Sequence, residues 1–147
     1  AQDPTRVYDA TSGWFKQSRS DFDSEHIYFR TADLKPKKRP MLLSECGGYT
    51  LDTAERTDGK KTYGYGKCKD VAELSAKYRE DFESDVLDNI PKGLCMSIYT
   101  QLSDIEDEIN GIYTYDREVL KFDEAMLKEL NEKINVMNKQ ERTICNT

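Results

Sequence analysis

The sequence has no long hydrophobic run. None of its apolar stretches approaches the roughly 20 residues that a helix needs to cross a bilayer. Its first ten residues, AQDPTRVYDA, also lack the apolar segment of a secretory signal peptide. We therefore expect no membrane partner.

Positive charge is also scarce. The formal net charge is −6 and the sequence pI is about 4.9. The one basic cluster, KPKKRP at residues 35–40, is short and flanked by prolines, which is typical of a solvated loop before a strand. Because binding to nucleic acid depends on neutralising phosphates, this balance argues against a nucleic-acid partner.

Metal-binding patterns are missing as well. The chain contains one histidine, and no pair of its four cysteines has metal-ligand spacing. Two disulfides are conceivable, but a chain of 147 residues is not a small stapled scaffold. We expect reduced thiols, a cytoplasmic location, no metal and no cofactor.

Two segments have the apolar period of an amphipathic helix, within a chain long enough for one domain spanning residues 1–147. The first carries apolar residues every three or four positions and begins at a capping pair, Asp70 with Glu73. The second begins near Asp123. The two predicted stripes are Val71, Leu74, Tyr78, Phe82 and Val86, and Met126, Leu130, Ile134 and Met137.

Four short segments are typical of strands: RVYDA (6–10), EHIYF (25–29), PMLLSE (40–45) and LCMSIYT (94–100). The last two are almost continuously apolar, which favours strands covered on both faces. Loops of a dozen or more residues suit parallel crossovers better than hairpins. The order of elements therefore predicts an α/β fold with a parallel sheet.

A carboxylate followed by two glycines ends the third predicted strand, in the stretch MLLSECGGY (41–49). In parallel α/β folds, functional groups lie just beyond the C-terminal ends of strands. Glu45 falls at such a position, and Gly47 and Gly48 permit a sharp backbone turn beside it. An ordinary polar residue at a strand end is the alternative interpretation.

Four motifs in order resemble the last four strands of the catalytic barrel of family 2 glycoside hydrolases: DATSGW (9–14), SEHIYF (24–29), LLSECGGY (42–49) and YTQLSDIEDEINGIYTYDR (99–117). That family includes β-galactosidases, β-glucuronidases and β-mannosidases. Its members hydrolyse β-glycosides with retention of configuration on a (β/α)8 TIM barrel. The resemblance covers nearly the whole chain and implies the C-terminal half of such a barrel.

The resemblance implies a role for each of five residues. Glu45 is similar to the catalytic nucleophile, and Tyr28 to the tyrosine that hydrogen-bonds that nucleophile. His26 lines the sugar site, or has a structural role. Tyr99 stands where the family often has the tryptophan that forms the floor of the site. Trp14 borders the site or packs in the core.

A retaining glycosidase also needs an acid/base carboxylate roughly 5–5.5 Å from its nucleophile. In the family, that residue follows an asparagine at the end of an earlier strand, upstream of the segment seen here. The one Asn-Glu pair, Asn131–Glu132, falls within the second predicted helix. Asp104, Glu106 and Glu108 are substitutes with a weaker claim, since acids spaced by two usually carry solvated charge.

The resemblance thus implies a fragment of a retaining β-glycosidase, β-galactosidase-like, that carries the nucleophile, lacks the acid/base and is inactive alone. Its substrate is a β-glycoside. Half a barrel leaves open sheet edges, so we expect a homo-oligomer or pairing with the missing half-barrel. The alternative is a non-catalytic carbohydrate-binding or interaction module on a barrel-derived scaffold.

Overall fold

The computed structural model describes residues 3–13, 15, 19–28, 30–35, 38–53 and 62–144. Its main sheet contains β1 (Asp23–Ile27), β2 (Met41–Gly47) and β5 (Leu94–Thr100) in the order β1-β2-β5, with both strand pairs parallel. The prediction of an α/β fold with a parallel sheet is confirmed. A three-stranded sheet, rather than a four-stranded one, forms from the described residues.

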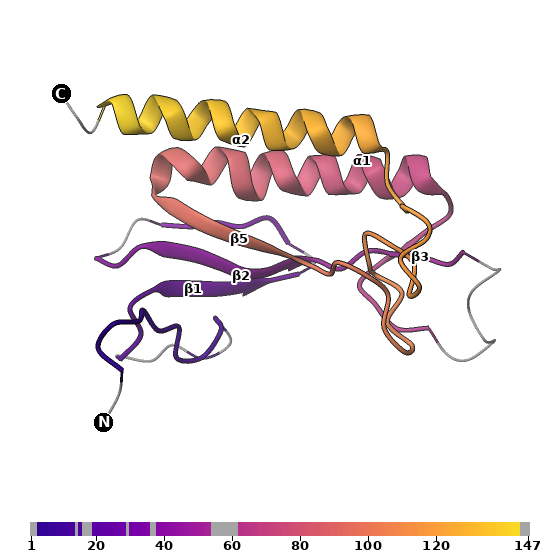
Figure 1. Ribbon diagram of the computed structural model, residues 1–147, viewed down its shortest axis with the longest axis horizontal. Helices are drawn as coiled ribbons and strands as arrows, with labels where there is room; N and C mark the ends of the chain where they lie inside the picture. Colours follow the sequence, from indigo (N-terminus) through magenta and orange to yellow (C-terminus); the bar gives the residue numbers. More distant parts are fainter. Residues whose placement is uncertain are drawn as a thin grey trace.

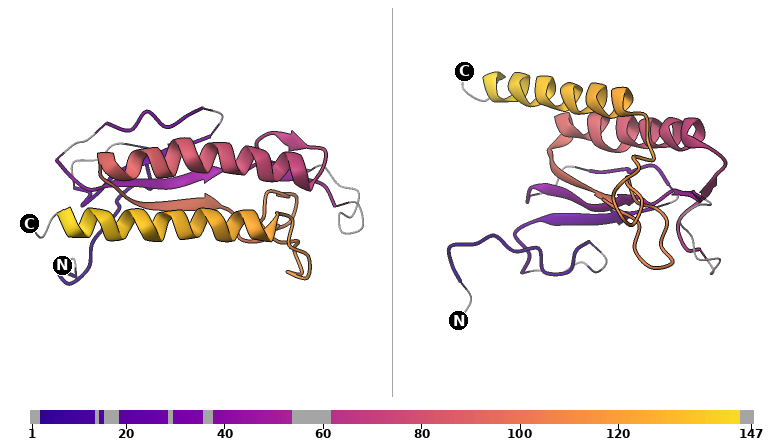
Figure 2. Two further views of the ribbon diagram at one scale, coloured as in Figure 1. Left: turned by 90° about the horizontal axis from the view of Figure 1, so that it is seen from above. Right: turned by 45° about the vertical axis from the view of Figure 1, so that its right-hand side comes forward.

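Both predicted helices are present and lie side by side over one face of the sheet (Figures 1 and 2). The first is α1 (Val71–Asp81), which continues as the π-helical turn η1 (Phe82–Val86) and the 3-10 helix η2 (Leu87–Lys92). The second is α2 (Glu124–Ile144). Neither of these helices, within the described residues, is long and apolar enough to span a membrane.

The start and end of the first helical segment follow from its sequence. The side chain of Asp70 accepts a hydrogen bond from the backbone N–H of Glu73 at 2.8 Å. The carboxylate of Glu73 accepts one in return from the N–H of Lys69 at 2.9 Å. The first contact satisfies an N–H group that the first turn of a helix leaves without a partner, and the second ties the residue before the cap to the same turn. At the other end, Gly93 adopts φ 102°, the left-handed conformation that glycine takes readily.

The hydrophobic core fills the space between the helices and the sheet, in two clusters. One joins the strands to η1 and contains Ile27, Ala32, Leu34, Met41, Leu43, Cys46, Val86 and Leu94. The other joins α1 to α2 and contains Leu51, Cys68, Leu74, Tyr78, Phe122, Met126 and Leu130. The predicted apolar stripes thus face the core at Leu74, Tyr78, Met126 and Leu130.

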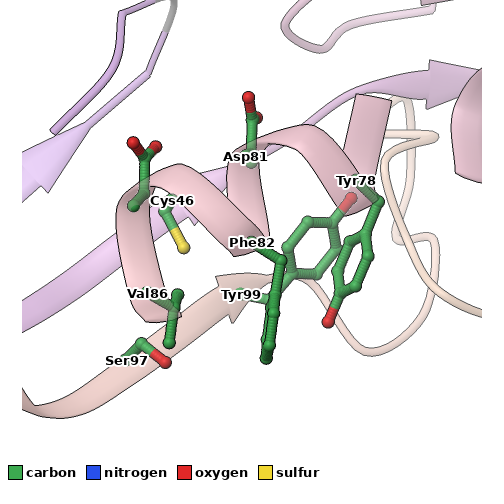
Figure 3. A pocket seen from close by; sticks show the side chains of 9 residues that line it. Cys46, Tyr78, Asp81, Phe82, Val86, Ser97 and Tyr99 are labelled. Carbon is green, nitrogen blue, oxygen red and sulfur yellow. The ribbon is translucent and has the colours of Figure 1, made fainter. Parts of the chain in front are cut away.

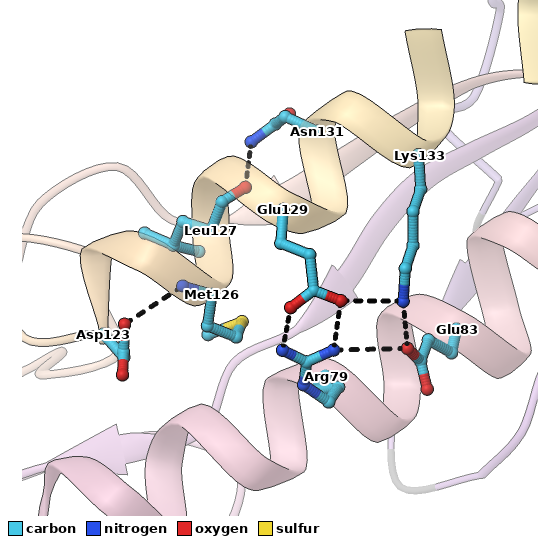
Figure 4. Close-up of polar contacts among 8 residues, drawn as sticks. All are labelled: Arg79, Glu83, Asp123, Met126, Leu127, Glu129, Asn131 and Lys133. Atoms are coloured by element: carbon cyan, nitrogen blue, oxygen red, sulfur yellow. Dashed lines mark hydrogen bonds and ion pairs between the residues drawn. The ribbon is translucent and has the colours of Figure 1, made fainter. Parts of the chain in front are cut away.

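Charged side chains join the solvent-facing sides of the two helices (Figure 4). The guanidinium of Arg79 donates to both carboxylate oxygens of Glu129, at 3.0 and 2.6 Å. Lys133 bridges Glu129 and Glu83, at 3.0 and 2.9 Å. The hydrogen bonds from Arg79 and then Lys133 lower the pKa of Glu129 to about 2. Because these contacts are exposed, we expect them to add little to the stability of the fold. Their main effect is to align α1 with α2.

The predicted strand at residues 6–10 is wrong, because these residues form irregular backbone. Instead of extending the sheet, the segment exchanges hydrogen bonds with Asp21: the N–H of Tyr8 donates to the Asp21 carboxylate, and the N–H of Asp21 donates to the Tyr8 carbonyl. The Ser24 hydroxyl donates to Asp9 at 2.8 Å. This N-terminal segment therefore lies on the face of the sheet opposite the helices (Figure 1).

A long loop follows β5 and is held by a buried ion pair. The ammonium of Lys121, whose side chain is fully buried, lies 2.8 and 3.0 Å from the two carboxylate oxygens of Asp104. It also donates to the carbonyl of Ile109 at 2.8 Å, while Asp104 accepts from the N–H of Gly111 at 2.7 Å. A second, two-stranded sheet of β3 (Thr50–Leu51) and β4 (Lys67–Cys68) lies nearby.

Candidate functional site at the strand ends

A β-bulge in β2 sets the direction of Glu45. Glu25 of β1 pairs with Leu43, but its neighbour His26 pairs with Glu45, so Ser44 is the extra residue on β2. The hydroxyl of Ser44 donates to the carbonyls of Ser12 and Glu25, at 2.7 and 3.0 Å. Leu43 and Cys46 consequently share the helix-covered core. Glu45 then faces the opposite side, because successive residues of a strand alternate between faces.

Two side chains from β1 and the residue after it converge on Glu45. The hydroxyl of Tyr28 donates to Oε2 of Glu45 at 2.7 Å. Nε2 of His26 pairs with the same oxygen. Among the described residues, Oε1 of Glu45 has no hydrogen-bond partner, and the side chain is 37% exposed. The carboxylate is therefore anchored through one oxygen and open to a ligand through the other.

The electrostatics keep this carboxylate ionised. Burial alone raises the pKa of Glu45, but the hydrogen bonds from Tyr28 and then His26 outweigh burial, so the pKa lies below its ordinary value of 4.5. The pKa of Tyr28 is raised, first by burial and then by its hydrogen bond to Glu45. At neutral pH the pair is thus a neutral phenol donating to a carboxylate.

Gly48 allows a second aromatic ring to approach the site. It has φ +81°, a left-handed conformation, and a Cβ there would lie 2.5 Å from the ring of Tyr65 and 3.1 Å from that of Tyr28. The two rings stack with centroids 4.1 Å apart. The glycine after the strand end thus makes room for the tyrosine that covers Tyr28.

Tyr99 lies on the other face of the sheet. It pairs in register with Cys46, and its ring makes edge contacts with Tyr78 and Phe122 in the core beneath the helices. Figure 3 shows it beside a small cavity lined also by Cys46 and Tyr78. The predicted role of Tyr99 as floor of a sugar site stays a prediction that this placement does not favour. Trp14 lies outside the described residues.

The acidic residues after β5 divide into three environments. Asp104 is buried against Lys121, which gives it a structural role. Glu106 is exposed. Glu108 is half-buried and accepts a hydrogen bond from Nε2 of Gln101 at 3.2 Å.

The pair Asn131–Glu132 lies within α2, where the Asn131 amide donates to the carbonyl of Leu127, as Figure 4 shows.

Sequence reasoning brought Glu45, Tyr28 and His26 together but missed Tyr65 and Gln101. Tyr65 belongs to the stretch YGYG at 63–66, where glycines between tyrosines were a usable signal of close approach. Gln101 directly follows β5, which is a strand end of the same kind as Glu45. No group of three potential metal ligands occurs within the described part of the chain.

Comparison with protein-family models and with curated proteins finds no match to this chain. The function proposed below therefore depends on the side-chain geometry at the strand ends.

Proposed function

We propose that Glu45 is the nucleophile of a retaining β-glycosidase and that this chain is the half of a (β/α)8 barrel that carries it. The observation that carries the proposal is the Tyr28 hydroxyl donating to Oε2 of Glu45 at 2.7 Å, at the C-terminal end of parallel strands. A hydrogen-bonded, partly exposed carboxylate with a lowered pKa has the charge that attack on an anomeric carbon requires.

The proposed step uses the free oxygen of the carboxylate. Oε1 of Glu45 attacks the anomeric carbon of a β-glycoside, the bond to the glycosidic oxygen breaks, and the leaving alkoxide takes a proton from a general acid. Water then attacks the glycosyl ester, gives its proton to the same group acting as base, and releases the sugar and Glu45. Tyr28 and His26 hold Oε2 throughout and orient the attacking oxygen.

We propose that the acid/base is a carboxylate other than those near Glu45 in the part of the chain that the structure describes. Asp104 is neutralised by Lys121, and Glu106 is exposed in the loop after β5. We accordingly propose that the chain alone has little or no turnover. The free thiols of Cys46, Cys68 and Cys95 support the further proposal of a reducing, cytoplasmic location.

Activated glycosides test the nucleophile without the missing acid. A 2,4-dinitrophenolate leaving group departs without protonation, so Glu45 is expected to become glycosylated, and the ester persists because no base activates water. The panel comprises the β-galactoside, β-glucuronide, β-mannoside and β-glucoside. Intact mass should rise by one glycosyl residue, with peptide mapping placing the adduct on Glu45. An adduct on another residue, or none with any sugar, would contradict the proposal.

A pH profile tests the role of Tyr28. Tyr28→Phe removes a donor to the ionised carboxylate, so the pKa of Glu45 should rise. Labelling requires the carboxylate, so the acid limb of its rate should move to higher pH in the variant. At pH 7 Glu45 is ionised in both proteins, and any difference there measures positioning.

The control for this profile is Tyr8→Phe, which removes a hydroxyl that donates to the Asp3 carbonyl in the N-terminal segment. Its acid limb should coincide with that of the unchanged chain. If the acid limb of Tyr28→Phe does not shift, Tyr28 does not stabilise the ionised Glu45 carboxylate.

An open apolar strip on the sheet supports self-association. Met96 and Ile98, two positions apart on β5, are 44% and 48% exposed. β1 and β5 are also both edge strands of the main sheet. We propose that a second copy covers this strip. Sedimentation should show a dimer that Ile98→Lys converts to monomer, whereas Val136→Lys on α2 leaves it intact; a monomeric unchanged chain would count against a dimer.

The second candidate function is carbohydrate binding without cleavage. It is favoured by the exposed ring of Tyr63 beside the site, because aromatic surfaces stack against sugar rings. Sugar binding without any covalent adduct on Glu45 would support this module over the glycosidase.

A further inference from the structure

An aromatic surface extends outward from the hydrogen-bond donor of Glu45. The ring of Tyr65 stacks on Tyr28 with an interplanar angle of 25°. Tyr63 meets Tyr65 edge-on, with centroids 5.8 Å apart and an angle of 71°. Tyr63 is 52% exposed. Three tyrosines thus form a continuous path from the carboxylate to solvent.

The backbone fixes this surface from two sides. The N–H of Tyr65 donates to the carbonyl of Gly48, directly after β2, at 2.8 Å. The N–H of Tyr63 donates to the carbonyl of Asp107 at 2.6 Å, and the Tyr63 carbonyl accepts from the N–H of Ile109 at 3.3 Å. The backbone that carries the two outer rings is therefore fixed before any ligand arrives, which reduces the entropy lost on binding.

A second carboxylate, Glu108, belongs to a residue whose backbone forms a β-bridge with that of Tyr63. The pKa of Tyr65 is raised to about 12, first by its hydrogen bond with Tyr63, then by burial and by the charges of Tyr63, Glu108 and Glu45. Gln101 donates to Glu108 at 3.2 Å and to Asn110 at 2.7 Å, which orients the Glu108 carboxylate. The segment that pairs with Tyr63 thus carries an oriented hydrogen-bond acceptor, the Glu108 carboxylate.

We propose that Tyr63, Tyr65 and Glu108 form a subsite for the sugar unit that adjoins the one attacked by Glu45, so that the substrate class is a β-linked oligosaccharide. One face of a pyranose ring presents C–H bonds that stack on an aromatic π-face. Its equatorial hydroxyls donate to a carboxylate, which forms stronger hydrogen bonds than a neutral acceptor. This subsite deepens the proposed function and rests on it for the role of Glu45.

Binding measurements test the subsite without requiring bond cleavage. Ligand-observed NMR titrations would compare β-linked disaccharides of galactose, glucose and mannose with the free monosaccharides. Tyr63→Ala and Tyr65→Ala should each weaken disaccharide binding about tenfold, the order of a lost aromatic contact. The ratio of disaccharide to monosaccharide affinity should fall in Tyr63→Ala, because only the disaccharide reaches the outer ring. Tyr65→Phe keeps the ring and should bind as the unchanged chain does.

The matched control is Tyr115→Ala, which removes an exposed ring from another turn of the chain. Circular dichroism establishes that each variant is folded, and Tyr63→Ala is the safer variant because Tyr65 also covers Tyr28. Equal affinity for disaccharide and monosaccharide, no sugar binding at all, or full binding by folded Tyr63→Ala would each overturn the subsite. Retained disaccharide binding without labelling of Glu45 would reject the nucleophile and keep the subsite.

Discussion

Glu45→Gln should lower the rate of glycosylation by activated β-glycosides by at least roughly a thousandfold, since removing a covalent nucleophile typically costs several orders of magnitude. The amide has the same shape but no negative charge, so it cannot form the glycosyl ester. Tyr28 can still donate to its oxygen, so the fold should be unchanged. The measurement is dinitrophenolate release under single-turnover conditions, with intact mass as the second readout.

Glu106→Gln provides the matched control, because it makes the same chemical change at an exposed carboxylate after β5. It should label at the unchanged rate. Glu108→Gln separates two roles. If Glu108 only binds sugar, the substitution lowers labelling by oligosaccharides; if Glu108 is the nucleophile, the substitution abolishes labelling by every substrate. If the unchanged chain turned over ordinary aryl β-glycosides, a second catalytic carboxylate would lie within it, and Glu108 would be the first to test.

Lys121→Met should be the most destabilising single change considered, by about 3–5 kcal/mol, the usual cost of removing one partner of a buried ion pair. The methionine fills a similar volume but leaves the Asp104 carboxylate buried without its cation. The carbonyl of Ile109 also loses its donor. Urea unfolding followed by circular dichroism measures the change in free energy of unfolding.

The double variant Lys121→Met/Asp104→Leu should recover part of this loss, because it removes the buried charge together with its partner. Lys128→Met, at an exposed pair with Glu124 on α2, should leave the free energy of unfolding unchanged within error. A Lys121→Met protein as stable as the unchanged chain would show that this ion pair does not hold the loop after β5.

The elements with strong local signals could be predicted closely. LCMSIYT gave β5 at residues 94–100, because a continuous apolar run flanked by turns has few other conformations. The capping pair at Asp70 located the start of α1. The strand predicted at residues 6–10 was wrong, because a strand-like pattern alone does not supply a neighbouring strand with which to pair. Its backbone bonds to Asp21 instead.

Part of the candidate site could also be predicted, because it too has a local sequence signal. A strand end could be found from the apolar run before Glu45, and the resemblance added Tyr28 and His26. The face of the sheet toward which each side chain points could not be predicted. Strict alternation along β2 would put Glu45 on the same face as Met41 and Leu43, in the core.

Local periodicity and turn chemistry were enough to predict both helices, three parallel strands and the polar groups at strand ends. Two contacts of the site could not be predicted in this way: the bulge at Ser44 turns Glu45 toward Tyr28, and Tyr65 covers Tyr28. These contacts join residues 17 or more positions apart. They depend on strand register and backbone approach, which no local pattern encodes.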